Sequence, residues 1–150
     1  MRQALPPNLR ASLPAPAAYA VLGAAESVPA AGGAYLLLVR LDRPLAVDIP
    51  RLAAGILPPG WYAYAGSARG PGGMRARIAR HLKADKPVHW HIDRLTPAAA
   101  TLLALAYPEA DECALLSALL DCGAFTVPLP RFGSSDCRQC PSHLLRWRHG

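Results

Sequence analysis

Two short apolar segments, each with a tyrosine close to a glycine, constrain the fold of this 150-residue chain more than any other feature. Gly33–Asp42 (GAYLLLVRLD) opens with glycine and is mostly apolar, which is typical of a buried strand. Trp61–Ser67 (WYAYAGS) alternates large and small residues, as a half-buried strand does. Pro58, Pro59 and Gly60 mark a turn in front of it. We expect the two strands to pair antiparallel in one sheet.

The rest of the chain predicts a mixed α and β domain. A glycine-rich loop at 70–73 leads into a helix from Met74 to about Lys83, because Met74, Ile78 and Leu82 recur with helical spacing. A second helix is predicted over Ala110–Leu120 and is closed near Gly123. Further short strands are predicted over 46–49, 101–107 and 143–147, and a helical turn over 89–95.

Length and composition favour one domain. At 150 residues and 15.9 kDa the chain has the size of a single domain. We expect residues 1–31, which are rich in Ala and Pro, to form an irregular arm and residues 32–150 to form the domain. No apolar run reaches the roughly 18 residues that a membrane span needs, and the N-terminus lacks the apolar core of a signal peptide. A cytoplasmic protein with reduced cysteines and no membrane partner is expected.

The charge distribution favours a polyanionic partner. The formal net charge is +6. Seven Lys or Arg residues and only two acidic residues lie between Arg69 and Arg94. A basic helix of this kind can follow a phosphate backbone, whereas the alternative is an ordinary solvated helix face.

A group of polar side chains next to the two strands points to phosphodiester chemistry. Tyr35 and Tyr64 lie on the predicted strands, and Arg77 and His81 are four residues apart on the first helix. Arginine offers a permanently charged planar fork for phosphate oxygens. Tyrosine or histidine can position or deprotonate a water molecule. On the second helix, Glu112 lies in a leucine stripe, so it is either a metal ligand or a solvated carboxylate in the first turn.

Two further motifs leave alternatives open. His89-Trp90-His91-Ile92-Asp93 either binds metal or nucleic acid, with Trp90 as a stacking platform and His91 as the functional histidine, or forms a structural hydrogen-bond cluster. Cys137 and Cys140, followed by His143, supply three of the four ligands of a zinc site, and Cys113, Cys122 or a distant histidine would have to complete it. A simple thiol pair and a disulfide are the other interpretations.

The order G-A-Y, Y-A-G-S, R-x-x-x-H and then a helical glutamate resembles the GIY-YIG nuclease superfamily. Y-A-G-S-A-R-G-x-G-G, R-x-x-x-H-L, H-W-H-I-D-x-L and S-D-C-x-x-C-x-S-H-L together resemble a branch whose members are sometimes fused to base-excision DNA glycosylases. This longer resemblance reaches Leu144 and links the chain to DNA repair. Alanine replaces isoleucine in both tripeptides, and the insertion over Asp42–Gly60 should form an added strand or loop.

The resemblance implies an α+β fold with a small three-stranded antiparallel sheet, flanking helices and added strands or loops. It implies an endonuclease with one divalent metal, Mg²⁺ or Mn²⁺, held by Glu112, with Arg77 on the scissile phosphate and His81 assisting. Either Tyr35 or Tyr64 would orient or activate the attacking water. Ser142 and His143 match the branch pattern and are expected to border the active face. The nucleic-acid-binding residues expected around this site are Ser67, Arg69, Arg75, Arg80, Lys83, Trp90 and His91.

The sequence therefore predicts a metal-dependent endonuclease acting on nucleic acid, with DNA favoured over RNA. A protein partner or a homodimer is an open possibility. The second hypothesis is a nucleic-acid-binding module that keeps the scaffold but has little or no turnover. The third is a zinc-stabilised interaction domain built around Cys137 and Cys140.

Overall fold

The computed structural model describes residues 5–14, 19–21, 28–52, 54–83, 85–133 and 140–149. Strand β2 (Gly33–Leu41) is followed by strand β5 (Gly60–Ala68), helix α2 (Gly73–Leu82), strand β6 (Thr101–Pro108) and helix α3 (Glu112–Asp121). The shorter elements are α1 (Pro7–Ala11), β1 (Tyr19–Val21), β3 (Leu45–Val47), β4 (Gly55–Leu57), β7 (Phe125–Thr126), β8 (Leu144–Trp147) and the 3₁₀ turns η1 (His91–Arg94) and η2 (Thr96–Ala98).

The central strands β6, β2 and β5 form an antiparallel core, and β1, β8 and β7 extend it to a six-stranded sheet in the order β1-β6-β2-β5-β8-β7. The expected α+β fold and the antiparallel pairing of the two tyrosine strands are confirmed. The 42–60 insertion contains the separate two-stranded hairpin β3–β4, so it adds strands outside the main sheet. Within the 1–31 segment, β1 pairs with β6.

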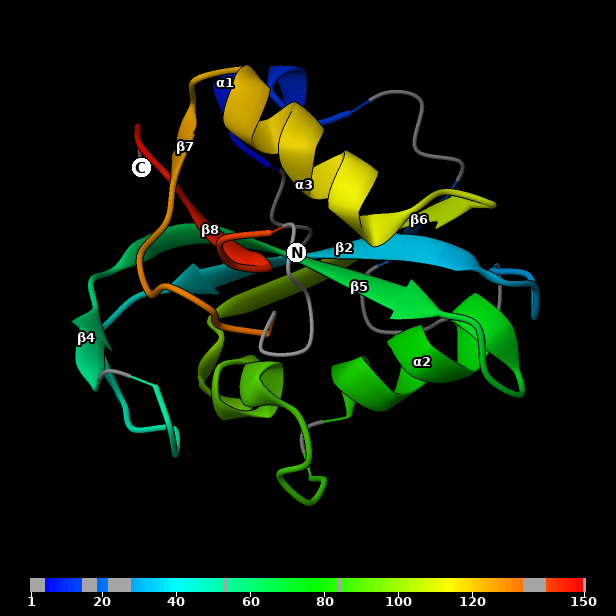
Figure 1. Ribbon diagram of the computed structural model, residues 1–150, viewed down its shortest axis with the longest axis horizontal. Coiled ribbons are helices and arrows are strands. Elements are labelled where there is room, and N and C mark those ends of the chain that lie inside the picture. Colours follow the sequence, from blue (N-terminus) through cyan, green and yellow to red (C-terminus); the bar gives the residue numbers. More distant parts are fainter. Residues whose placement is uncertain are drawn as a thin grey trace.

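The sheet is covered on both faces, which explains why β2 is apolar at every position except Arg40 near its end (Figure 1). Helix α2 packs on one face through Met74 and Ile78. Helix α3 packs on the other face through three leucines, Leu115, Leu116 and Leu119. Because side chains alternate along a strand, Tyr35 faces α2, whereas its neighbour Leu36 faces α3.

Both helices begin near their predicted positions. Helix α2 runs one residue ahead of the prediction, and Leu82 of its expected core stripe is only half-buried. Helix α3 begins at Glu112 rather than Ala110, because the extended residue Asp111 caps it and accepts a hydrogen bond from the Ala114 N–H at 3.1 Å. In the part of the chain that the structure describes, none of the helices combines the length and apolar character needed to cross a membrane.

Candidate active site

A cavity of about 290 Å³ lies at the edge of the sheet, beside the part of β5 that extends past β8. Strand β8 pairs with β5 only as far as Tyr64. Beyond that residue, Gly66 and Ser67 of β5 border the cavity instead of another strand. Its lining residues come from strands β2 and β5, from the helices on both faces of the sheet and from three loop segments: Tyr35, Tyr64, Gly66, Ser67, Arg77, Trp90, Glu112, Gly133 and His143.

The structure brings four of the five predicted catalytic side chains to this cavity: Tyr35, Tyr64, Arg77 and Glu112. Strand register explains the two tyrosines. Tyr35 pairs with Gly66 and Leu37 pairs with Tyr64, so both phenols project from the face that α2 covers. Arg77 comes from α2 on this face, while Glu112 comes from the start of α3, which packs on the opposite face.

Gly66 is required by the position of Tyr35. A Cβ atom built on Gly66 would overlap the ring and the hydroxyl of Tyr35, its cross-strand partner. The phenol therefore lies directly over the glycine backbone. This contact gives a physical reason for the glycine in the Y-A-G-S segment.

His81, the fifth predicted catalytic residue, is not among the residues that line the cavity. It is 1% exposed, and its Nε2 lies 2.7 Å from the Tyr35 hydroxyl. Burial lowers the pKa of His81 to about 3 and, on the other side of the hydrogen bond, raises the pKa of Tyr35 well above its ordinary value. Both groups are therefore uncharged at neutral pH. His81 does not reach the cavity itself but contacts Tyr35, which lines it.

Arg77 is oriented by two contacts. Its Nη1 donates to the Ser67 carbonyl at 3.2 Å, and its guanidinium carbon lies 4.5 Å from the centre of the Trp90 ring. The bond to Ser67 joins helix α2 to the exposed edge of β5. The positive charge of Arg77 is thereby held at the cavity wall.

Asp93 is the centre of a buried hydrogen-bond cluster, as the structural interpretation of the His89–Asp93 motif predicts, while the binding role of the motif stays a prediction. Its carboxylate accepts two bonds from Arg80, both at 2.9 Å, and one from each backbone N–H of His89 and Trp90, at 2.8 Å. Burial opposes ionisation of Asp93, but these bonds outweigh it and lower its pKa to about 2. The Arg80 guanidinium also lies 4.2 Å from the Trp90 ring centre.

Glu112 occupies the first turn of α3 and also lines the cavity. Its side chain is 28% exposed, and its Oε2 lies 3.9 Å from Nδ1 of His143. Burial raises the pKa of Glu112, and the neighbouring Asp111 carboxylate raises it further. A half-buried carboxylate that faces a polar cavity fits a hard cation such as Mg²⁺, which keeps several waters and takes one or two protein carboxylates.

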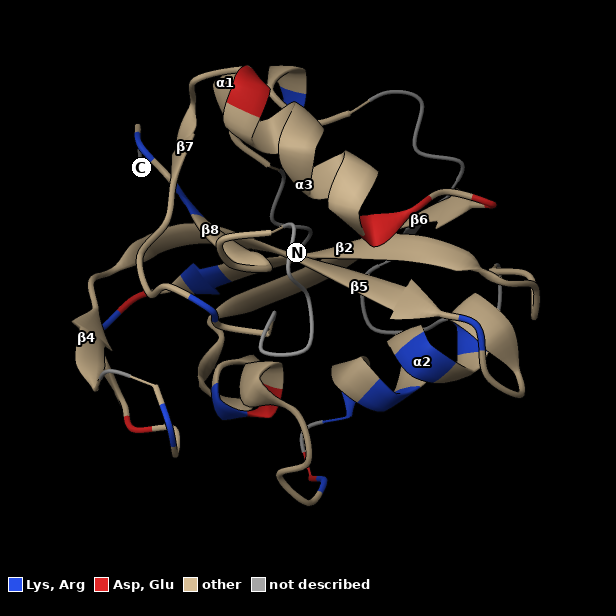
Figure 2. Cartoon of the chain, in the orientation of Figure 1, with Lys and Arg blue, Asp and Glu red and all other residues tan. Residues whose placement is uncertain are grey.

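The predicted nucleic-acid-binding residues lie in several environments, and the basic ones are most concentrated along α2 (Figure 2). Ser67 and Trp90 line the cavity. Lys83 is exposed at the end of α2, and the Arg69 side chain is 71% exposed and lies 3.9 Å from Asp111.

Three of these predicted residues use their side chains in structural contacts. Arg75 donates to the Val28 carbonyl at 2.6 Å. Arg80 is engaged by Asp93, and His91 accepts a hydrogen bond from the Gly133 N–H at 2.8 Å without lining the cavity. Their predicted contacts with nucleic acid stay predictions.

Three lining residues, Gly66, Gly133 and His143, are absent from the catalytic and binding residues that the sequence predicts, although His143 was expected to border the active face. The S-H-L pattern near the C-terminus pointed to His143 in the sequence. In the structure, burial lowers the pKa of its imidazole. No sequence motif pointed to Gly133. Cys137, which the sequence suggests as a zinc ligand, lies outside the described residues.

The fold and the cavity together define the class of this protein: a small α+β domain on an antiparallel sheet, with tyrosine, arginine and carboxylate side chains at the sheet edge. Residues 34–150 match the profile of the family described as the domain of unknown function DUF123, and the chain belongs to that family. No curated protein and no solved structure matches the chain.

Proposed function

We propose that this protein is a metal-dependent endonuclease that hydrolyses phosphodiester bonds in nucleic acid, with DNA as the favoured substrate. One observation carries the proposal: Tyr35, Tyr64, Arg77 and Glu112, from widely separated segments, line one cavity. The resemblance to the GIY-YIG nuclease superfamily supports it, because these residues stand at the matching motif positions. Figure 2 shows further basic residues along α2, the helix that carries Arg77.

Arg77 is suited to bind the reacting phosphate. The contacts with Ser67 and Trp90 fix the plane of its guanidinium, so less side-chain entropy is lost when a phosphate binds. A fixed cation at the cavity wall stabilises negative charge that develops on the phosphoryl oxygens. This interaction is stronger in the transition state than in the ground state, and that difference is what accelerates the reaction.

The two tyrosines are suited to orient the attacking water. Burial raises the pKa of Tyr35 and of Tyr64, so both hydroxyls are protonated at neutral pH and can donate as well as accept hydrogen bonds. His81 holds the Tyr35 hydroxyl through its 2.7 Å hydrogen bond, which makes it a positioning residue. The choice between Tyr35 and Tyr64 as the group closest to the water stays open.

Glu112 would hold the divalent metal, Mg²⁺ or Mn²⁺. When bound, such an ion would act as a Lewis acid that polarises the phosphate. Glu112 itself contributes a carboxylate whose charge is compensated in part by the Arg69 and Arg77 guanidiniums, both of which lower its pKa against the effect of burial.

The test is nicking of supercoiled plasmid by the full chain in Mg²⁺ or Mn²⁺, followed by a panel of single-stranded, duplex, flap and junction substrates. Glu112→Gln and Arg77→Ala should each reduce the rate by at least about 100-fold, since each removes a charged transition-state contact. Glu109→Gln and Arg43→Ala, which change exposed charges outside the cavity lining, are the matched controls. Metal-dependent cleavage that survives both active-site substitutions would reject the proposal.

A nucleic-acid-binding module with little or no turnover is the second candidate. The observation that favours it is the protonated, buried state of both tyrosines, which makes neither a strong base at neutral pH. This candidate predicts salt-sensitive DNA binding that Arg77→Ala weakens, with no metal-dependent product in the plasmid assay.

A further inference from the structure

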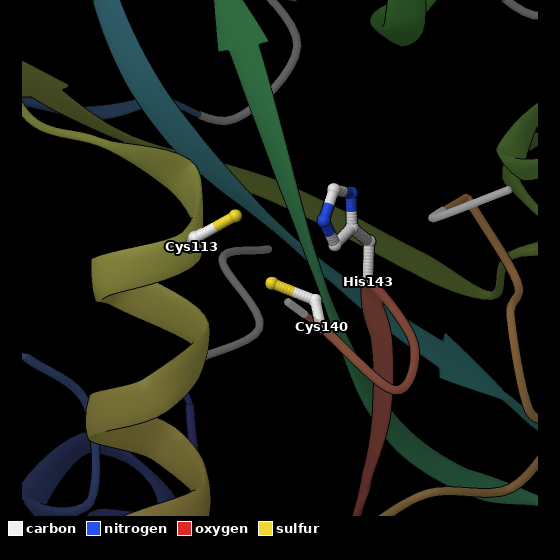
Figure 3. Close-up of side chains that lie close together, drawn as sticks. All are labelled: Cys113, Cys140 and His143. Atoms are coloured by element: carbon white, nitrogen blue, oxygen red, sulfur yellow. The ribbon is translucent and has the colours of Figure 1, made fainter. Parts of the chain in front are cut away.

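A cluster of soft metal ligands lies beside the cavity and plays no part in the proposed hydrolysis. Cys113, in the first turn of α3, faces Cys140 and His143, which precede β8 (Figure 3). One ligand atom from each residue, two Sγ atoms and a ring nitrogen, lies within 4.8 Å of the others. Cys140 and His143 follow Cys113 by 27 and 30 positions in the sequence. All three residues nevertheless direct their donor atoms at one point.

The distances among these atoms suit a tetrahedral Zn²⁺ centre. Zinc binds thiolate at about 2.3 Å and imidazole at about 2.0–2.1 Å, so its ligand atoms are separated by roughly 3.5–3.8 Å. The observed separations, all within 4.8 Å, exceed this by no more than about an ångström, and small side-chain rotations can close the difference. Two thiolates and an imidazole are the ligands that select zinc over Mg²⁺ or Ca²⁺.

The imidazole of His143 gives independent evidence for a ligand at this point. His143 is 4% exposed, and its buried Nε2 has no hydrogen-bond partner among the residues that the structure describes. Buried polar atoms are nearly always paired, so this nitrogen requires an explanation. In Figure 3 a ring nitrogen of His143 lies on the edge that faces the two sulfurs.

The surroundings of the cluster also suit a metal. Cys113 and Cys140 are half-buried and line a separate cavity of about 210 Å³, whereas His143 lines the candidate active site, so the cluster lies between the two cavities. On the other edge of the His143 ring, Nδ1 lies 3.9 Å from the Glu112 carboxylate. A carboxylate that accepts a hydrogen bond from a ligating histidine is the usual outer shell of a zinc site, and Glu112 lies on the correct edge of the ring for this role but beyond hydrogen-bond distance.

We propose that Cys113, Cys140 and His143 bind a Zn²⁺ ion, with the fourth position taken by water or a further ligand. The ion joins the first turn of α3 to the segment that leads into β8. Because Glu112 precedes Cys113 directly, the ion also fixes the position of the carboxylate that enters the cavity. This inference rests on the ligand geometry alone and does not require the proposed nuclease activity.

The test begins with the metal content of the full chain, purified without added chelator and measured by mass spectrometry. We expect about one zinc per chain. Cys113→Ser and Cys140→Ser should each reduce zinc to a trace, and His143→Gln should reduce it severalfold. Cys122→Ser is the matched control, because Cys122 is an exposed thiol at the end of the same helix that bonds to the Leu119 carbonyl instead. It should keep its zinc.

A second measurement does not depend on variants that fold poorly. The wild-type chain, stripped of metal and titrated with Co²⁺, should develop a thiolate-to-cobalt charge-transfer band in the near ultraviolet and ligand-field bands of a tetrahedral ion in the visible. Zn²⁺ should displace these bands at one equivalent. Absence of both zinc and the thiolate band would overturn the proposal. So would a band of equal strength in Cys113→Ser, or a Cys113–Cys140 disulfide in place of metal.

Discussion

Helices α2 and α3 pack on opposite faces of one sheet and both reach the same cavity, but they are held there by different forces. Helix α2 carries a connected set of polar side chains. Arg77 bonds to Ser67, Arg80 bonds to Asp93, and His81 bonds to Tyr35. Helix α3 packs on the sheet through leucines, and its link to the cavity is Glu112 in the first turn.

The difference indicates how each candidate catalytic side chain is positioned. A hydrogen bond has a preferred direction, so the polar contacts of α2 fix the orientation of the Tyr35 and Arg77 side chains. Leucine packing is non-directional and fixes the helix without fixing a carboxylate at its end. The position of Glu112 therefore depends on the helix cap at Asp111 and, in our proposal, on the zinc ion bound by its neighbour Cys113.

The largest effect on stability is expected from Asp93→Asn on the α2 side. The substitution removes the buried charge that pairs with Arg80, and it places an amide donor opposite groups that already donate. Loss of one partner of such a buried pair should cost about 3 kcal/mol of unfolding free energy. Urea denaturation measures this, and Asp85→Asn, which changes an exposed carboxylate nearby, should stay within about 0.5 kcal/mol. Equal stability of the two variants would contradict the account of α2.

Gly66→Ala should have the next largest effect, because the added methyl group overlaps Tyr35. Overpacking of this kind costs about 2 kcal/mol and displaces the phenol from His81. Thermal denaturation and nuclease assays should both detect the change. Gly70→Ala is the matched control, since a Cβ at Gly70 meets no atom within 4 Å. If the two variants behave alike, the close contact between Gly66 and Tyr35 is wrong.

The third prediction concerns acid stability. The folded protein keeps His81 neutral down to a pKa of about 3, whereas the unfolded chain binds a proton below the ordinary value of about 6.5. Stability from this group is complete above pH 6.5 and falls by up to about 1.4 kcal/mol per pH unit between that pH and about 3. The contribution of Asp93 follows at lower pH, between about 3.9 and its folded-state pKa of about 2.

Denaturation at a series of pH values checks this prediction. His81→Gln should reduce the slope in the upper part of the profile, to which His143, whose pKa burial also lowers, still contributes. His89→Gln, at an exposed histidine, should leave the slope unchanged. A wild-type profile without a slope between pH 6 and 4 would show that His81 is protonated in the folded protein.

The smallest effect is expected at the cap of α3. Asp111→Ala removes the acceptor for the Ala114 N–H and should cost about 1 kcal/mol. Asp111→Ser keeps a capping oxygen and should recover most of this loss in the same denaturation experiment. If the cap also positions Glu112, Asp111→Ala lowers the nicking rate more than Asp111→Ser does. Identical rates would show that the cap has no role in placing the carboxylate.

Local periodicity was enough to predict much of the fold. The alternation in Trp61–Ser67 and the apolar run of Gly33–Asp42 predicted an antiparallel pair, which the register of β2 and β5 confirms. Helical spacing placed Met74 and Ile78 in the core and Arg77 beside them. These predictions succeed because the backbone geometry of one strand or one helix determines which of its side chains share a face.

Contacts between residues of different helices, strands and loops were harder to predict from the sequence. The sequence favoured His91 as the functional histidine of its motif, but His91 accepts a hydrogen bond from the Gly133 backbone and does not line the cavity, whereas His143, which was expected to border the active face, does. The sequence offered Cys113, Cys122 or a distant histidine to complete a zinc site around Cys137, Cys140 and His143, and the structure directs Cys113 of α3 toward Cys140 and His143. The sequence did not indicate that the Arg80 side chain would donate hydrogen bonds to the Asp93 carboxylate.

The sequence by itself determined the residue types of the site, the strands and helices that carry them, and the net positive charge. The tertiary structure decided which of those residues meet, because that depends on how far β8 covers β5 and on where α2 and α3 cross the sheet. Those quantities are set by packing between residues distant in sequence, and no local pattern encodes them.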